Sequence, residues 1–511
     1  MEIVSVNALE SEKDFRLYLQ ELGKNQFSLF FNLKELLSGK SIPEYLVQYC
    51  NKDGILPKYR EPALISLISL AGLFGKLDEI QSYIEELFKI SDNPANLHSA
   101  IYYLGYLENY SDKELNKLAK LVYERFFEKQ LSKNREKIKL LTQTLVIPNE
   151  KIQVGFLIRS ITNVETFLAS CCEHVDKNKY QFHWFYLGKE ISDKHLDLLS
   201  NCRSYNQIPE QDSLKIAEEI VKKGIHILID SRGIVPVNCL EIFSLKPAPI
   251  QLSTFGYWAS TGLPQIDFIN ILNEKLFSQD SLNSLQEQTL SGWNYSYIAK
   301  SALLLEIKPT PCLERKYISF GNLGKMIKIN TTVLETWAKI LRAVPNSHLI
   351  LSNQALNKSD YHKYLLEFFD EHGISQDRIN LFEILRTEQY YEFYNQIDIS
   401  LDSFPFTSSS TAMDCIWMST PIITRCTGRK TVENFAKEIL TLVKMPELIA
   451  ADTEEYIAKA VELANDFSRI DNYKKTLRHK LLESKFLNLK KAGNDFEKML
   501  DEAIQKTKNK S

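Results

Sequence analysis

The first 148 residues carry apolar side chains at the spacing of amphipathic helices. Leu, Ile, Phe and Tyr recur at every third or fourth position through residues 15–37, 63–74 and 77–90. This spacing follows the helical period, and the alternation typical of strands is absent. We predict an all-α N-terminal domain over residues 1–148, built from helical hairpins as in a solenoid, although no fixed repeat period identifies a named repeat family.

Beyond residue 148, short apolar strands begin to alternate with helices. Strand patterns lie at 152–158, 182–188, 225–231, 316–321, 348–353 and 378–383, and helical patterns at 213–223, 330–343 and 358–371. Such alternation is typical of a parallel sheet covered by helices, and the region 234–310 between the two series is less regular. We therefore predict an α/β protein with two Rossmann-like domains, 149–311 and 312–465, followed by C-terminal helices over 466–511. A ligand is expected in the cleft between the two domains.

The segment from 397 to 425 combines a strand, a hydroxyl-rich loop and the start of a helix. An apolar strand at 397–401 and the first apolar positions of the helix are separated by small hydroxyl side chains, those of Ser408, Ser409, Ser410 and Thr411. The first turn of a helix has unpaired N–H groups and a partial positive charge, and small residues let an anion approach them. Asp414 lies on this turn, where its carboxylate is placed to accept hydrogen bonds from a ribose. The segment predicts a nucleotide phosphate site, although an ordinary strand–helix unit with a Ser/Thr cap has the same pattern.

Composition and charge narrow the classes of function. The 511 residues suit roughly three domains, and a formal net charge of −3 does not favour a nucleic acid as partner. The 8 cysteines form no C-x-x-C motif, which argues against a zinc knuckle and fits a reducing compartment. The longest apolar run, near residues 64–74, is shorter than the ~20 residues that cross a bilayer, and the N-terminus does not have the pattern of a signal peptide. We expect a cytoplasmic protein without a membrane span.

Four segments, at residues 224–233, 245–269, 318–351 and 401–424, match one family in the same order. The second reads LKPAPIQLSTFGYWASTGLPQIDFI, which is similar to the family run R-P-A-P-I-Q…L-G-Y-P-x-T-S-G…D-Y-I. Together they resemble glycosyltransferase family 41, which contains the nucleocytoplasmic O-GlcNAc transferases, their bacterial relatives and the bacterial adhesin N-glucosyltransferases. The resemblance implies a GT-B fold, in which the second of two Rossmann-like domains holds most of the nucleotide-sugar.

The resemblance also implies an activity, the inverting transfer of a hexose or HexNAc from a UDP-sugar to a protein side chain, without a metal ion or another cofactor. The helical N-terminal domain would then select the acceptor polypeptide. Phe404-Pro405-Phe406 resembles the N-linked branch, whose acceptor is Asn, whereas Trp417-Met418 resembles the O-linked branch, whose acceptor is Ser or Thr. The mixture suggests a divergent bacterial member.

On the donor side, the resemblance assigns a role to each matching residue. Lys328 matches the lysine that contacts the diphosphate, where a cation stabilises the negative charge growing on the departing UDP. Asp414 matches the ribose-binding aspartate, and Tyr390, or else Tyr391, matches the ring presented to the uracil. The other implied donor contacts are the hydroxyls of Ser409, Ser410 and Thr411 at the β-phosphate and backbone groups of Leu385 and Thr387 at the base edge.

On the acceptor side, Gly256 and Tyr257 match a loop that faces the sugar and the acceptor. The O-GlcNAc branch has a histidine, a candidate general base, where this chain has Val164. A base must lie within hydrogen-bond reach of the acceptor. Glu165 next to it, His226, which matches a family histidine near the acceptor or the sugar, and a phosphate oxygen of the donor remain open as the proton acceptor.

Two other functions compete with an active protein glycosyltransferase. A catalytically inactive partner or binding subunit of a glycosylation system is favoured by Val164 and opposed by Lys328 and Asp414. An enzyme that builds glycans on small acceptors is less favoured, because a helical domain of about 150 residues suits a peptide substrate better. Binding of UDP without sugar transfer would distinguish the inactive subunit from the enzyme.

Overall fold

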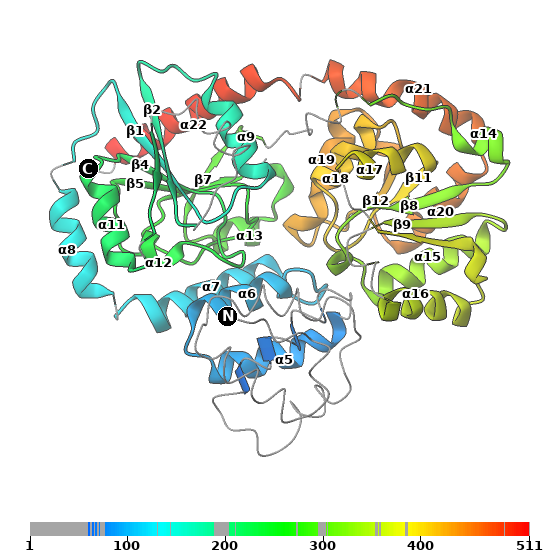
Figure 1. Cartoon of the computed structure of the whole chain (residues 1–511), viewed down its shortest axis with the longest axis horizontal. Coiled ribbons are helices and arrows are strands. Elements are labelled where there is room, and N and C mark those ends of the chain that lie inside the picture. The colour runs from blue at the N-terminus through cyan, green and yellow to red at the C-terminus, as the bar shows by residue number, and fades with distance from the viewer. Residues whose placement is uncertain are drawn as a thin grey trace.

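The computed structural model describes most of the chain from Arg60 to Asn509. Two α/β lobes lie side by side, and the N-terminal helices lie across the junction between them (Figure 1). The described residues are 60–61, 64–65, 67–68, 71, 77–129, 131–143, 145–188, 204–209, 211–271, 274–294, 303, 305–352, 356, 359–383, 387–484 and 486–509.

The first lobe is built on a parallel sheet that has seven strands in the described part of the chain, in the order β3-β2-β1-β4-β5-β6-β7. Its strands are β1 (Ile152–Ile158), β2 (Tyr180–Tyr186), β3 (Ser204–Gln207), β4 (Ile227–Asp230), β5 (Ile250–Ser253), β6 (Phe268–Ile271) and β7 (Gln288–Ser291). Its helices are α9 (Asn163–Cys172), α11 (Ser213–Lys222), α12 (Leu240–Phe243) and α13 (Gln279–Ser284). The central strand β1 is an almost continuous apolar run because both faces of a parallel sheet are covered.

The second lobe is a parallel sheet whose six described strands follow the order β10-β9-β8-β11-β12-β13. They are β8 (Ser319–Asn322), β9 (His348–Ser352), β10 (Ile379–Phe382), β11 (Ile399–Leu401), β12 (Ile422–Arg425) and β13 (Ile449–Ala450). The helices are α14 (Pro311–Arg315), α15 (Thr331–Ala343), α16 (Ser359–Glu371), α17 (Thr387–Phe393), α18 (Ser410–Trp417), α19 (Asn434–Leu442), α20 (Thr453–Ala464) and α21 (Phe467–Glu483). The two predicted Rossmann-like domains are confirmed, and the less regular region 234–310 contains the short strands β5, β6 and β7.

The C-terminal helices divide between the lobes. Helix α21 lies on the second lobe, and α22 (Leu489–Lys508) runs back over the first (Figure 1). Phe496 of α22 stacks on Trp293 at 4.2 Å between ring centroids and joins the core of the first lobe. The two lobes are therefore joined a second time, at the end of the chain.

The described part of the chain before Ile152 is helical, as predicted, and residues 1–59 lie outside the described residues. Its helices are α5 (Leu77–Ile90), α6 (Pro94–Leu104), α7 (Asp112–Val122) and α8 (Ser132–Thr142). Apolar residues of these helices share one continuous core with the first lobe and with Phe406 and Val432 of the second. Among the described helices, none is long and apolar enough to span a membrane.

Candidate functional site

The loop that follows β11 is shaped by a buried carboxylate at the carboxyl end of the second sheet. Asp402 accepts hydrogen bonds from the Ser408 backbone N–H at 3.1 Å and from Thr424 Oγ1 at 2.7 Å. Burial raises the pKa of Asp402, and these hydrogen bonds and the nearby amine of Lys328 oppose the shift. A buried carboxylate with several donors fixes the loop backbone in one conformation.

The hydroxyl-rich segment opens helix α18 as predicted. Ser409 is the N-cap residue and makes no side-chain capping bond. Ser409, Ser410 and Thr411 are partly exposed, and their hydroxyls have no hydrogen-bond partner among the described residues. Because the N–H groups of this first turn also lie free of intrahelical partners, the helix start presents donors suited to an anion.

The amine of Lys328 reaches the same loop. Lys328 ends a short 3₁₀ turn, Met326–Lys328, that follows β8. Its Nζ donates to the backbone oxygen of Thr407 at 2.9 Å and lies 4.3 Å from the ring centroid of Phe406. Loss of solvation lowers the pKa of this amine to about 7, with Asp402 opposing the shift. The second lobe thus brings Lys328 to the loop that carries the free hydroxyls.

Asp414 is the fifth residue of α18, so it lies just beyond the first turn on which the sequence analysis placed it. Its side chain is buried, and two tyrosines contact it. The hydroxyl of Tyr391 donates to Oδ1 at 2.8 Å, and that of Tyr390 donates to Oδ2 at 2.9 Å. Burial raises the pKa of Asp414 to about 7, and the two tyrosine hydrogen bonds oppose the shift. The two alternatives for the uracil ring therefore both touch the candidate ribose ligand. Thr387 begins α17, and Leu385 lies outside the described residues.

On the first lobe, Gly256 and Tyr257 lie in the loop after β5. A Cβ at Gly256 would overlap the backbone oxygen of Ser231, so only glycine fits this close approach of two loops. Tyr257 is buried, and its hydroxyl has no hydrogen-bond partner in the described structure. Next to it, Trp258 meets Phe406 of the second lobe edge to face at 4.7 Å. The predicted acceptor loop therefore touches the loop after β11, to which the amine of Lys328 is hydrogen-bonded.

The structure does not place His226 near the loops of the candidate site. His226 precedes β4 at the amino end of the sheet, and its Nδ1 accepts the backbone N–H of Gln153 at 2.9 Å. The loops of the candidate site follow the carboxyl ends of the strands, which is where ligands bind in parallel sheets. His226 is thus separated from them by the length of the strand.

Glu165 lies at the carboxyl end of the first sheet, but its carboxylate is occupied. It closes a capping box with Thr162 at the start of α9. Its Oε2 accepts the Thr162 backbone N–H at 2.7 Å, and its Oε1 accepts the Ser231 hydroxyl at 2.7 Å. Glu165 is fully buried, and its two oxygens join helix α9 to the loop after β4.

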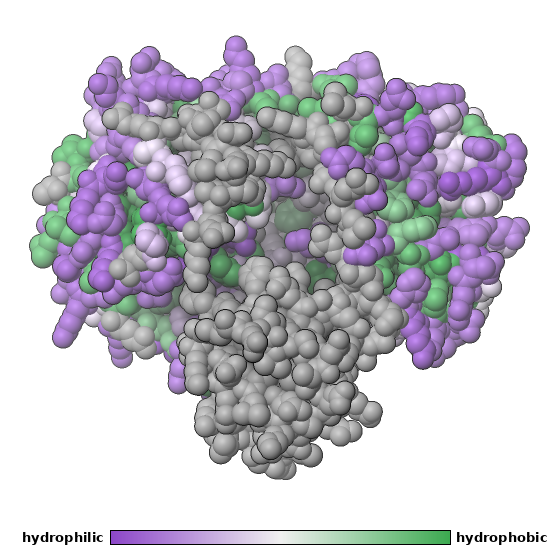
Figure 2. All heavy atoms as spheres, in the orientation of Figure 1, coloured by the Kyte–Doolittle hydropathy of each residue, from purple (hydrophilic) through white to green (hydrophobic). Residues whose placement is uncertain are grey.

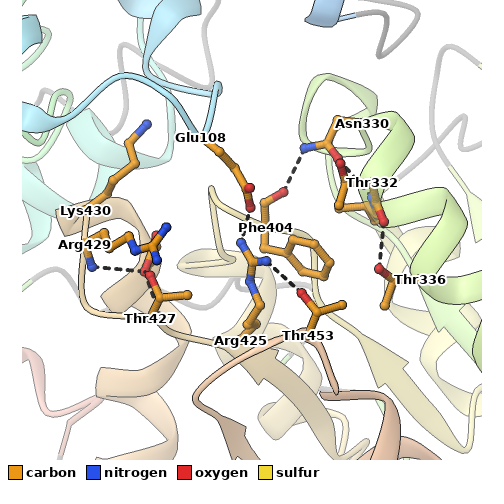
Figure 3. A network of polar contacts seen from close by, with 12 residues as sticks. Glu108, Asn330, Thr332, Thr336, Phe404, Arg425, Thr427, Arg429, Lys430 and Thr453 are labelled. Carbon is orange, nitrogen blue, oxygen red and sulfur yellow. Dashed lines mark hydrogen bonds and ion pairs between the residues drawn. The ribbon is translucent and has the colours of Figure 1, made fainter. Parts of the chain in front are cut away.

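A polar pocket that the sequence analysis did not predict lies beside the candidate site, between the N-terminal helices and the second lobe. The guanidinium of Arg425 forms an ion pair with Glu108 and donates to Thr453 Oγ1 at 3.0 Å (Figure 3). The cavity of this pocket has a volume of about 190 Å³ and is lined by Glu108, Arg425, Thr427, Arg429, Glu433, Asp452 and Thr453. The surface is also hollowed between the two lobes (Figure 2). Within the described residues, no cluster of His, Cys, Asp and Glu suits a metal ion.

Known proteins match most of this chain. The model of the family described as glycosyl transferase family 41 matches residues 98–284 and 279–496. The chain belongs to this family. The resemblance to glycosyltransferase family 41, which rested on four sequence segments, is therefore confirmed.

Curated relatives are similar over more than half of this chain. Two are each named "Probable UDP-N-acetylglucosamine--peptide N-acetylglucosaminyltransferase SPINDLY": that of Hordeum vulgare is 28% identical over 58% of this chain, and that of Arabidopsis thaliana is 29% identical over 67%. The chain covers 31% and 38% of their lengths, so it spans about a third of these relatives. A mutant O-GlcNAc transferase of Thermobaculum terrenum has the same fold, with a TM-score of 0.76, 19% identity, and coverage of 87% of this chain and 85% of that one. This likeness confirms the predicted GT-B fold.

Proposed function

We propose that the chain is an inverting, metal-independent glycosyltransferase that moves a hexose or HexNAc from a UDP-sugar to a Ser, Thr or Asn side chain of a polypeptide. Membership of family 41 and the names of its relatives support transfer to a protein. The observation that carries the proposal is the meeting of the Lys328 amine with the hydroxyl-lined start of α18 on one loop. This combination suits a nucleoside diphosphate.

In the proposed reaction, the acceptor atom attacks the anomeric carbon from the face opposite UDP, and the bond between that carbon and the phosphate oxygen breaks. The leaving diphosphate gains negative charge, which the Lys328 ammonium and the donors of Ser409, Ser410 and Thr411 stabilise. Asp414 accepts hydrogen bonds from the ribose. A preorganised charge of this kind acts in the transition state more than in the ground state.

The acceptor must also lose a proton. Both oxygens of Glu165 hold a helix cap and a loop, and His226 lies at the amino end of its sheet. Of the three alternatives, these positions favour an oxygen of the donor phosphate, which is already next to the attacked carbon. In that case no protein side chain is required as the base, and the valine at position 164 is compatible with activity.

The test is a panel of UDP-glucose, UDP-galactose, UDP-GlcNAc, UDP-GalNAc and GDP-mannose, each with a peptide library and with or without EDTA. Binding is measured by calorimetry, and release of nucleotide and added peptide mass are measured in the same samples. Selective UDP-sugar turnover that is insensitive to EDTA supports the proposal, and Lys328→Ala should lower it at least ~100-fold. UDP binding without turnover would indicate an inactive partner subunit, and preference for GDP-mannose would contradict the donor assignment.

A further inference from the structure

One buried carboxylate oxygen joins all three parts of the molecule. Asp112, the first residue of α7, is 2% exposed. Its Oδ2 accepts hydrogen bonds from the backbone N–H of Thr431 at 2.9 Å, from the Thr431 hydroxyl at 2.7 Å and from the hydroxyl of Ser281 at 3.1 Å. Thr431 belongs to the second lobe and Ser281 to α13 of the first, so an N-terminal side chain ties both lobes together.

The same contacts continue to the amine of Lys328. Val432, next to Thr431, offers its backbone oxygen to Thr407, whose N–H and hydroxyl donate to it at 3.1 and 2.7 Å. The backbone oxygen of Thr407 in turn accepts from Lys328 Nζ at 2.9 Å. Thr407 and Val432 are fully buried, so water does not compete for these bonds.

A second series of contacts runs from the hairpin formed by α6 and α7 to the amine of Lys328. The ring of Tyr106, between α6 and α7, stacks on Phe406 with centroids 4.5 Å apart and planes 16° apart. Lys328 Nζ lies over the ring of the same Phe406, 4.3 Å from the ring centroid. Lys430, beside Thr431, anchors this region by donating to the backbone oxygens of Gly105 and Leu107 at 2.9 and 2.6 Å.

We infer that Asp112 is a positioning residue for Lys328, acting through Thr431, Val432 and Thr407. The inference rests on the proposed function, in which the Lys328 ammonium stabilises the leaving diphosphate. The α6–α7 hairpin then helps to position the catalytic centre, in addition to any role in recognising the acceptor. A small displacement of a charge-stabilising group weakens the transition state more than it weakens donor binding.

The matched test compares Thr431→Val with Thr431→Ser. Valine has the shape of threonine but lacks the hydroxyl that donates to Asp112, whereas serine keeps the hydroxyl. We expect Thr431→Val to lower kcat roughly 10- to 100-fold with little change in the donor KM, and Thr431→Ser to retain most of kcat. Asp112→Asn, which keeps the shape and loses the charge, should show the same split between kcat and KM.

Glu108→Gln is the control, because Glu108 reaches Arg425 across the same interface but not along the route to Lys328 (Figure 3). Melting temperatures of all variants separate loss of folding from loss of positioning. If Thr431→Val and Asp112→Asn fold and turn over like Glu108→Gln while Lys328→Ala loses activity, the inference is wrong and the proposed function stands. If Lys328→Ala itself retains full turnover, the proposed function fails.

Discussion

Binding of UDP to this chain should weaken as the pH rises above 7, because the lysine that receives the diphosphate is already losing its proton there. Desolvation lowers the pKa of free Lys328 to about 7, with Asp402 opposing the shift and Lys325 adding to it. A bound diphosphate stabilises the ammonium and raises this pKa again. Above pH 7, binding must therefore be accompanied by uptake of a proton.

The size of the effect follows from linkage. With a free pKa of about 7 and a bound lysine that stays charged, Lys328 alone raises the Kd about fivefold from pH 7 to 8 and about ninefold from pH 8 to 9. Asp414, whose pKa is raised to about 7, acts in the opposite direction, because its ionised form accepts ribose hydrogen bonds better. By pH 8 that carboxyl is largely ionised, so the interval from 8 to 9 reports mainly on Lys328.

The assay is calorimetric titration with UDP at pH 8 and 9, in buffers that differ in ionisation enthalpy. At pH 8 we expect uptake of about 0.9 proton per UDP bound. Lys328→Met, which keeps the length of the side chain and removes the amine, should bind more weakly, with no proton uptake and a Kd almost independent of pH between 8 and 9. An equal rise of the Kd in wild type and Lys328→Met would refute the reasoning, as would a wild-type Kd that does not change.

Four other variants test the assignments around the site. Asp414→Asn should weaken UDP binding roughly 10- to 100-fold by calorimetry, because a hydrogen bond to a charged group contributes about 1.5–3 kcal/mol. An unchanged affinity would contradict the ribose assignment. Glu165→Gln should lower the free energy of unfolding by about 1 kcal/mol, because it weakens the helix cap. Glu165→Gln and His226→Gln should both keep a turnover rate within about threefold of wild type. A drop of about 100-fold in either variant would instead indicate that this side chain is the general base. Gly256→Ala should lower the melting temperature and turnover together, since its Cβ overlaps the Ser231 backbone, and a wild-type rate at wild-type stability would contradict the close packing of the two loops.

Much of the fold could be predicted because parallel strands leave a strong local signal. The buried run 152–158 coincides with β1, and the strands predicted in the second lobe lie within three residues of β8, β9 and β10. Strands β5, β6 and β7 were not predicted because only short helices accompany them: α12 before β5 has four residues and α13 before β7 has six, so the strand–helix alternation is weak there. Such short runs show neither helical nor alternating periodicity.

The site was harder to predict because its contacts join distant residues. The hydroxyl run and Asp414 stand out as a local motif, but nothing near Asp414 indicates that Tyr390 and Tyr391 both donate to it. Asp112 and Thr431 are 319 residues apart in the sequence, so their contact leaves no local pattern. Glu165 is different, since Thr-x-x-Glu before an apolar run is a capping-box signature that the sequence itself displays.

The N-terminal helices illustrate a further limit of sequence reasoning. Their amphipathic period predicts helices but does not say what covers the apolar faces. In the structure, Leu104, Tyr106 and Leu115 share a core with the first lobe, and Asp112 and Lys430 fix the same hairpin to the second. A domain expected only to recognise the acceptor is therefore also part of the framework around the site.

A structure of the chain with UDP bound tests the central assignment most directly. We predict that the diphosphate lies at the N–H groups and hydroxyls of Ser409, Ser410 and Thr411, within hydrogen-bond distance of Lys328 Nζ, with the ribose hydroxyls on Asp414. A diphosphate bound elsewhere, for example in the pocket beside Arg425, would contradict both the donor site and the role given to Lys328.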